Sequence, residues 1–187
     1  MRVLRLGLAV AALLAGSPAL EALAAPAAPI ETGIGPVTKL PLPRYASLKT
    51  DRVNLREGPS KDHRTLWVFQ RAGLPVEIVG EFENWRRIRD SEGTEGWVLH
   101  SLLSGRRTAI VNAGPDRGIE KAAISLRAKA DDGADDEAKL QTGVIGSVKS
   151  CTGTWCRLIV ALPNKRDVDG YIRQNRLWGV YPNEVVE

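Results

Sequence analysis

The 187 residues leave room for one medium domain or two small ones, and a hydrophobic content of 43% excludes a disordered chain. Eighteen glycines and eleven prolines favour many turns and short strands over long helices. The formal net charge of +4 comes from basic residues interspersed with acidic ones, which argues against a nucleic-acid surface, and no internal apolar run is long enough to span a membrane.

The first 24 residues have the organisation of a secretory signal peptide. Arg2 and Arg5 give a short basic start, and an apolar run follows over 6–15. Ala22 and Ala24 then place small residues at the two positions that a signal peptidase recognises. We expect cleavage near Ala24, a periplasmic or secreted protein, and no stable membrane insertion after cleavage. An uncleaved anchor is the alternative for this segment.

Residues 25–44 follow and contain five of the eleven prolines. Because proline lacks a backbone N–H and fixes φ, this composition predicts an extended, proline-rich tether that takes no part in a sheet. The tether would hold the folded part away from the membrane during export.

A first folded unit is predicted over 45–111. Apolar and polar side chains alternate in it as half-buried strands require, and Gly93 ends a tight turn that needs a positive φ. Short strands are expected at 51–56, 65–70, 75–81, 85–90 and 94–99, with a closing strand near 107–111. So many short strands in so few residues predict a small, strongly bent barrel.

The same pattern returns after a short linker over 112–117, in a second unit over 118–183. Residues 124–127 (ISLR) repeat 53–56 (VNLR) at an offset of 71, and Trp155 repeats Trp85 at an offset of 70. The Gly-Tyr-Ile at 170–172 repeats the Gly-Trp-Val at 96–98 at an offset of 74. The offset changes only in predicted loops, where insertions are tolerated, which indicates a true duplication.

Both units resemble the bacterial SH3-like (SH3b) domain family. The family pattern is a V-x-V-R-x-G-P strand and loop, a G-x-x-V strand, a W-x-x-V strand and a closing G-W-V. The first unit matches it at 53–59, 73–76, 85–88 and 96–98. The second departs from it, with Ala-Lys-Ala at 128–130 in place of Glu-Gly-Pro and Tyr171 in place of the tryptophan. The resemblance implies an all-β chain of two tandem SH3-like β-barrels with a binding role.

Cys151 and Cys156 are the only cysteines. At the offset of 70 they match Glu81 and Arg86, which flank a predicted hairpin turn, so we expect them to face each other at bridging distance. An exported protein meets oxidising conditions, and we predict a structural disulfide. A catalytic thiol is the alternative, although the second unit has no histidine to activate it.

Tryptophans and arginines are the candidate binding residues. Trp85 and Trp97 could line a shallow groove, with Arg56 and Arg87 supplying charge, which suits a peptide or a glycan-bearing ligand. The alternative is that both rings simply cover the edge of the core.

No cofactor and no metal site is expected from the remaining polar residues. His63 and His100 lack further ligands at zinc spacing, and the acidic loop 131–137 does not have the spacing of a helix–loop–helix calcium site. We expect a solvated loop at 131–137 instead.

Three functions compete at this point. The first is a non-catalytic module that binds a cell-envelope ligand, either a peptidoglycan peptide or a protein segment. The second is a structural or interaction protein of the periplasm that acts only through a protein partner. The third, a hydrolase, would need a separate catalytic domain, and no residues remain to build one, so we predict that the chain is not an enzyme. The identity of the ligand and the oligomeric state do not follow from the residues.

Overall fold

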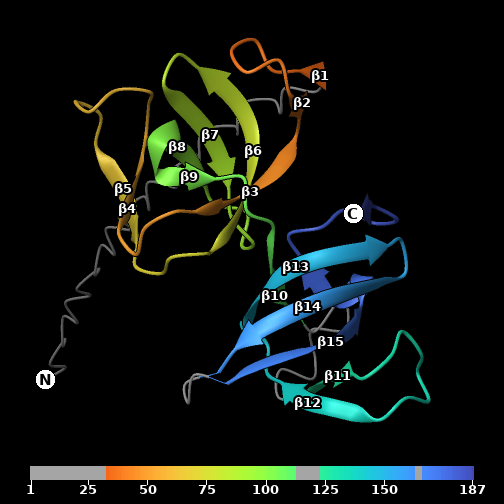
Figure 1. Cartoon of the computed structure of the whole chain (residues 1–187). Helices are drawn as coiled ribbons and strands as arrows, with labels where there is room; N and C mark the ends of the chain where they lie inside the picture. The colour runs from red at the N-terminus through yellow and green to blue at the C-terminus, as the bar shows by residue number, and fades with distance from the viewer. Residues whose placement is uncertain (1–32, 113–122, 163–165) are drawn as a thin grey trace, which may run out of the picture.

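The computed structural model describes residues 33–112, 123–162 and 166–187. The predicted signal peptide, the tether up to residue 32 and the linker residues 113–117 lie outside these ranges. The described residues form strands, turns and two short 3-10 segments, and the strands gather into two large bent sheets and a separate two-stranded one (Figure 1). The predicted all-β fold of two SH3-like barrels is confirmed.

Barrel 1 is a seven-stranded antiparallel sheet in the order β5-β4-β8-β7-β6-β3-β9. Its elements are β3 (Arg44–Leu48), β4 (Val53–Arg56), β5 (Thr65–Phe69), β6 (Pro75–Phe82), β7 (Trp85–Arg89), β8 (Glu95–Leu99), the 3-10 turn η1 (His100–Leu102) and β9 (Leu103–Ser104). Alternate side chains point inward, so that Leu55, Ile88 and Val98 are fully buried in one core. Gly93 has φ +90° at the predicted β7–β8 turn.

Barrel 2 repeats this order as β12-β11-β15-β14-β13-β10-β16, with β17 added on β13. Its elements are β10 (Thr108–Val111), β11 (Ile124–Arg127), β12 (Asp136–Leu140), β13 (Ile145–Thr152), β14 (Trp155–Ala161), β15 (Asp167–Arg173), the 3-10 turn η2 (Gln174–Arg176), β16 (Leu177–Trp178) and β17 (Val185–Val186). Leu126, Leu158 and Ile172 fill its core. They stand in sequence where Leu55, Ile88 and Val98 stand in barrel 1, at the offsets of 71, 70 and 74.

The boundary predicted between the two units was wrong. The strand that was expected to close the first unit, β10, pairs with β13 and β16 and therefore opens barrel 2. Barrel 1 ends with β9, and residues 105–107 connect the two barrels. The alternation of residues 107–111 indicates which side chains point inward, but it does not specify the strand with which they pair. From the sequence alone, this strand could therefore belong to either barrel.

β10 has in barrel 2 the position that β3 has in barrel 1, at an offset of 63. The Leu48 N–H donates to the Leu74 carbonyl (2.9 Å), and the Val111 N–H donates to the Val144 carbonyl (2.8 Å). The strand β3 was not predicted at all, and the equivalence of these bonds shows that it is the first strand of the repeat. The offset rises to 71 at Ile124, so barrel 2 has eight extra residues between its first two strands.

The tether prediction was wrong from residue 33 onward. β1 (Gly33–Ile34) and β2 (Pro41–Leu42) pair as a two-stranded sheet, and the Leu42 side chain is buried in the barrel 1 core. We call residues 33–42 the strap. Pro41 begins β2 and lies opposite Ile34, a position that proline can take because the first residue of an edge strand need not donate to the ladder.

The two barrels contact each other through side chains from both. The Tyr45 ring packs edge-on against Trp178 (ring centroids 5.2 Å apart) and tilts against Tyr181 (4.6 Å). The Tyr181 hydroxyl donates to Glu77 Oε1 (2.9 Å), and Thr108 Oγ1 donates to the Gly73 carbonyl (2.8 Å). Burial, reinforced by Glu77, raises the pKa of Tyr45 to about 12, so this phenol stays neutral at the joint. Several contacts of different kinds thus fix one barrel on the other.

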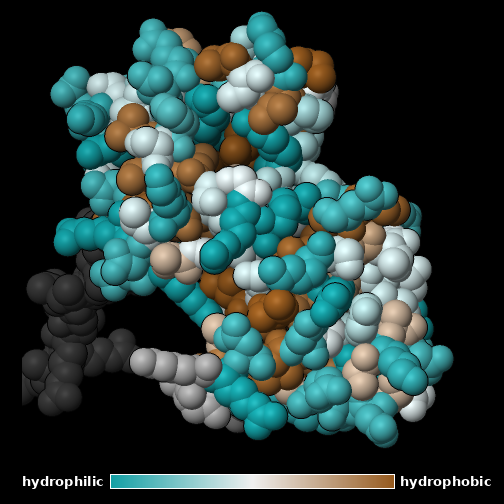
Figure 2. Space-filling view, viewed as in Figure 1, coloured by the Kyte–Doolittle hydropathy of each residue, from teal (hydrophilic) through white to brown (hydrophobic). Residues whose placement is uncertain are grey.

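The surface is mixed, in agreement with the interspersed charges of the sequence. Hydrophilic and hydrophobic residues alternate over both barrels on the face seen in Figure 2. Among the described residues, no helix is long and apolar enough to cross a membrane.

Candidate functional site

Three of the four predicted binding residues lie in one row across barrel 1. Trp97 on β8 is the direct cross-strand partner of Arg56 on β4 and of Arg87 on β7. Directly opposed residues have Cβ atoms about 4.5–5.5 Å apart, so the indole stands between the two arginine stems. We call Arg56, Trp97 and Arg87 the first row. It lies on the outer face of the sheet, because its neighbours Leu55, Ile88 and Val98 point into the core.

Gly96 explains why β8 can lie so close to β4. A Cβ atom at this position would lie 2.7 Å from Leu55 Cγ and 2.8 Å from the Arg56 carbonyl oxygen. Any side chain here would push the strands apart and separate Trp97 from Arg56. Gly96 is therefore a geometric requirement of the row.

Arg56 also closes the loop that follows it. Its Nη1 donates to the His63 carbonyl (2.7 Å), and the Glu57 N–H donates to the Arg64 carbonyl (3.0 Å). The His63 ring packs over Gly58, where a Cβ would come within 2.4 Å of Nε2. One edge of the guanidinium is thus used to hold the loop over 57–64.

Arg87 is held by an acid that sequence reasoning missed. Its guanidinium forms an ion pair with Glu95 on the neighbouring strand, and the two side chains are only 13% and 17% exposed. Glu95 precedes Trp97 by two residues, which places both side chains on the same face of β8. That spacing is the signal that could have found it. Arg87 therefore positions the indole more than it offers charge to a ligand.

Trp85 does not share the exposure expected of a groove wall. Only 8% of its surface is accessible, whereas Trp97 is half-buried. Trp85 is paired with Leu99, one step further along the same strands. The alternative reading, that the ring covers the edge of the core, fits Trp85.

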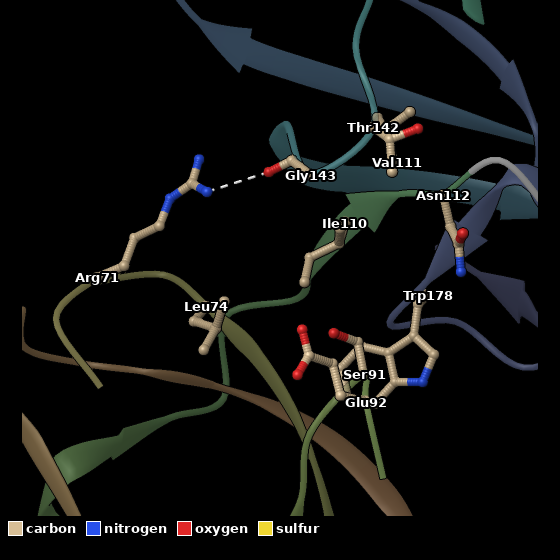
Figure 3. Close-up of a pocket in the computed structure, with 10 residues that line it drawn as sticks. All are labelled: Arg71, Leu74, Ser91, Glu92, Ile110, Val111, Asn112, Thr142, Gly143 and Trp178. Atoms are coloured by element: carbon tan, nitrogen blue, oxygen red, sulfur yellow. Dashed lines mark hydrogen bonds between the residues drawn. The ribbon is translucent and has the colours of Figure 1, made fainter. Parts of the chain in front are cut away.

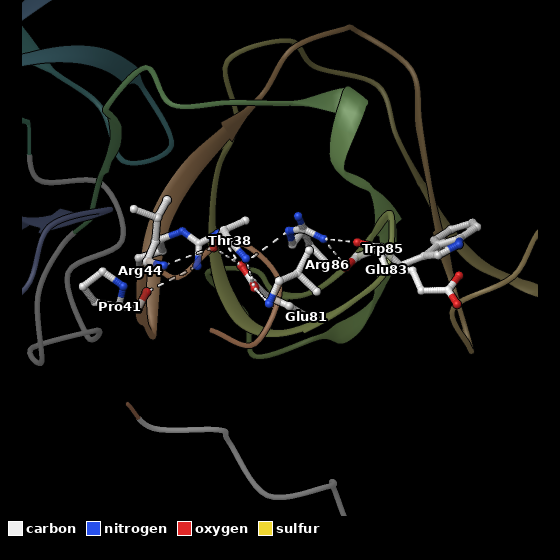
Figure 4. Close-up of polar contacts among 9 residues, drawn as sticks. Thr38, Pro41, Arg44, Glu81, Glu83, Trp85 and Arg86 are labelled. Carbon is white, nitrogen blue, oxygen red and sulfur yellow. Dashed lines mark hydrogen bonds and ion pairs between the residues drawn. The ribbon is translucent and has the colours of Figure 1, made fainter. Parts of the chain in front are cut away.

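Inside the open end of barrel 1 lies a buried charge cluster around Glu81. Glu81 is opposite Arg86, and its side chain is completely buried. Its carboxylate accepts bonds from the Thr38 hydroxyl, from the Thr38 N–H (2.8 Å) and from Arg44 Nη2 (2.8 Å) (Figure 4). Burial acts to raise the pKa of Glu81, but these hydrogen bonds outweigh it and lower the pKa to about 2. The carboxylate is ionised and saturated, so it is a structural group.

The predicted disulfide is confirmed. Cys151 and Cys156 are direct partners in the β13–β14 hairpin, with their Cα atoms 4.1 Å apart, and they are bonded. Both are buried, Cys156 completely. Neither is a free thiol, and no cluster of three or more His, Cys, Asp or Glu side chains in the described part of the chain is placed to hold a metal ion.

The other polar residues weighed from the sequence lie in turns, except that the predicted loop 131–137 ends early, because Asp136 begins β12 and pairs with Arg127 in the sheet. His100 begins the turn η1, and its N–H donates to the Asn84 carbonyl (2.8 Å). In the loop over 131–137, Asp132 is paired with Arg173, and Asp136 is paired with Arg127 and Lys139.

A concave feature that was not predicted lies between the barrels. It is a cleft of about 750 Å³ (Figure 3). Arg71, Leu74, Ser91 and Glu92 of barrel 1 and Ile110, Val111, Asn112, Thr142, Gly143 and Trp178 of barrel 2 line it. Arg71 Nη1 spans it to the Gly143 carbonyl (3.0 Å). Because the cleft exists only once the barrels dock, no local sequence signal could have found it. Neither Trp85 nor Trp97 lines it.

Two solved structures are distantly similar to this chain. NlpC2 from Trichomonas vaginalis is 12% identical, with a TM-score of 0.31, over 73% of this chain and 48% of that chain. NlpC1 from the same organism is 12% identical, also with a TM-score of 0.31, over 77% of this chain and 48% of that one. This chain thus spans about half the length of either protein, and the similarity is too slight to transfer an activity. No curated protein matches the sequence.

The family comparison is specific. The bacterial SH3 domain family matches residues 49–105 and again residues 120–179, one stretch in each barrel and together more than half of the chain. Both matches end near the 3-10 turn that follows the closing Gly-aromatic strand. The chain therefore belongs to the bacterial SH3 domain family, with two copies in tandem.

Proposed function

We propose that this chain is a non-catalytic binding module of the cell envelope, which binds an extended peptidoglycan peptide across the first row. The observation that carries the proposal is the half-buried Trp97 ring held between Arg56 and Arg87 on the outer face of barrel 1. An indole offers a large contact area at low entropic cost, and a guanidinium beside it can pair with a peptide carboxylate.

Membership of a family of binding domains supports a binding role. The signal peptide expected at 1–24 supports an envelope location, and stem peptides of the cell wall are abundant there. Such peptides are extended and rich in carboxylates, which suits a flat row of this kind better than a deep pocket. Arg56 is the cation that a carboxylate would meet, because Arg87 is largely occupied by Glu95.

Retention on purified peptidoglycan sacculi tests this function. We expect Trp97→Ala to weaken retention at least about tenfold, the loss typical of a central aromatic at an interface. Trp67→Ala is the matched control, because Trp67 is 60% exposed on the same barrel but lies outside the row. It should leave retention unchanged.

Two results would overturn the proposal. Equal losses for the two variants would mean that Trp97 has no special role. No retention of the wild-type chain, together with recovery of a protein after crosslinking in the periplasm, would favour the alternative of an interaction protein.

A further inference from the structure

Barrel 2 contains a second copy of the row in the same register. Tyr171 on β15 is the cross-strand partner of Arg127 on β11 and of Arg157 on β14. We call these three residues the second row. Arg127, Arg157 and Tyr171 match Arg56, Arg87 and Trp97 at the offsets of 71, 70 and 74. Like Trp97, Tyr171 is half-buried on the outer face.

The contacts that hold the first row recur around the second. Arg127 Nη1 donates to the Ala134 carbonyl (2.8 Å) and closes its loop as Arg56 does. A Cβ on Gly170 would lie 2.8 Å from the Arg127 carbonyl oxygen, the same distance as between Gly96 and Arg56. The close approach of the two strands is therefore the same in both barrels.

The acid beside the row also recurs. Arg157 donates through Nε (2.9 Å) and Nη2 (2.6 Å) to the two oxygens of Asp169, which matches Glu95 at the offset of 74. These side chains are 47% and 41% exposed, so a merely structural ion pair at this site would contribute little to stability. The duplicated barrels have changed most of their surface residues, and yet they share the arginines, the aromatic and the acid.

We propose that the second row is a second binding site for the same class of ligand, so that the chain binds the cell wall bivalently. The proposal rests on the proposed function of the first row. The docked barrels hold both sites on one unit, and a sacculus displays many copies of one peptide. The second binding event is then intramolecular, and avidity can exceed either single affinity by about 10²-fold or more.

The second site should be the weaker of the two. A phenol gives less contact area than an indole. The Arg127 guanidinium also shares its charge with Asp136, whose Oδ1 lies 3.3 Å from Nη1, which leaves less attraction for a carboxylate.

Backbone chemical shifts of the wild-type chain, titrated with a soluble monomeric muropeptide, test both sites without any mutation. We expect shifts at the amides of both rows, saturating at a higher concentration for the second. Shifts at residues 56, 87 and 97 alone would overturn the second site and leave the proposed function standing. Shifts at 127, 157 and 171 alone would overturn the first site, and no shift at either row would overturn both.

Retention on sacculi tests the bivalency. Tyr171→Ala should weaken it about tenfold, whereas Tyr171→Phe, which keeps the ring, should not. Val185→Ala is the control for an exposed apolar residue in the same barrel, at 66% exposure. A Tyr171→Ala variant that is folded and retained like the wild type would overturn the proposal.

Discussion

In each barrel the two strands of the equivalent hairpin are linked at the same position, but by different chemistry. In barrel 1 the opposed inner residues at the end of β6 and the start of β7 are Glu81 and Arg86, a buried ion pair. In barrel 2 the equivalent residues are Cys151 and Cys156, a disulfide. Both positions lie at an open end of the barrel, where the hydrophobic core stops and inward-pointing side chains still need a partner.

The two solutions place different demands on the rest of the chain. A buried carboxylate needs every lone pair satisfied, and the strap supplies the Val37 and Thr38 N–H groups while Arg44 supplies a second cation. A disulfide needs no such donors, and β17 merely covers it, with Val186 opposite Cys151. The strap is therefore part of barrel 1, to which it contributes hydrogen bonds to Glu81 as well as the buried Leu42 side chain.

Replacing Glu81 by Gln should have the largest effect on stability. The variant leaves Arg86 buried without its counter-charge, which typically costs about 3–5 kcal/mol. Urea unfolding measures the loss, and hydrogen exchange should locate it in barrel 1. Glu57→Gln is the control, because the Glu57–Arg64 pair (3.7 Å) is exposed and should contribute at most about 1 kcal/mol. Equal losses in the free energy of unfolding for both variants would show that the buried cluster contributes no more to stability than an exposed ion pair.

Acid should remove the same contact in the wild-type chain. The pKa of Glu81 is lowered from 4.5 to about 2, so its contribution is complete above pH 4.5 and is lost as the pH falls towards 2. A shift of this size corresponds to a contribution on the order of 3 kcal/mol. Amide exchange should accelerate in barrel 1 over this range, and Glu81→Gln should abolish the dependence. In barrel 2 a hydrogen bond from Arg173 lowers the pKa of Asp132 at the surface, where solvent screens the effect.

Removing the disulfide should cost less and should act on the other barrel. The cysteines are five residues apart, and closing so short a loop contributes about 2 kcal/mol in the entropic model. We expect the double variant Cys151→Ser, Cys156→Ser to lose this amount in urea unfolding, with faster exchange in barrel 2 alone. Faster exchange in barrel 1 as well would mean that the barrels unfold as one cooperative unit.

The strands with a strong alternating pattern could be predicted from the sequence. The repeat also predicted which residues of the second unit face each other across its hairpin. Matching Cys151 and Cys156 to Glu81 and Arg86 placed the disulfide correctly, because the offset of 70 preserves the pairing of the hairpin. Arg56, Arg87 and Trp97 were named from the sequence as members of one candidate site, and Trp97 is the cross-strand partner of both arginines, while their role in binding stays a prediction.

What could not be predicted depends on contacts between distant segments. The strap looked like a tether because its structure comes from Glu81, more than forty residues away. β10 looked like the end of the first unit because its partners, β13 and β16, come later in the chain. The burial of Trp85 and the engagement of Arg87 by Glu95 are decided by packing on the outer face, which alternation alone does not describe.

The joint between the barrels should give the smallest effect. Tyr181→Phe removes the hydrogen bond to the Glu77 carboxylate, which is worth about 1.5 kcal/mol, the low end for a bond to a charged group, because Arg89 remains paired with the same carboxylate (2.6 Å). The rings of Tyr45 and Trp178 stay in contact, so the barrels should remain docked. Residual dipolar couplings would therefore fit one rigid body in both proteins, with only a small reorientation in the variant. If the couplings of the variant instead require two independent bodies, that single hydroxyl holds the joint, and a bivalent site would depend on it.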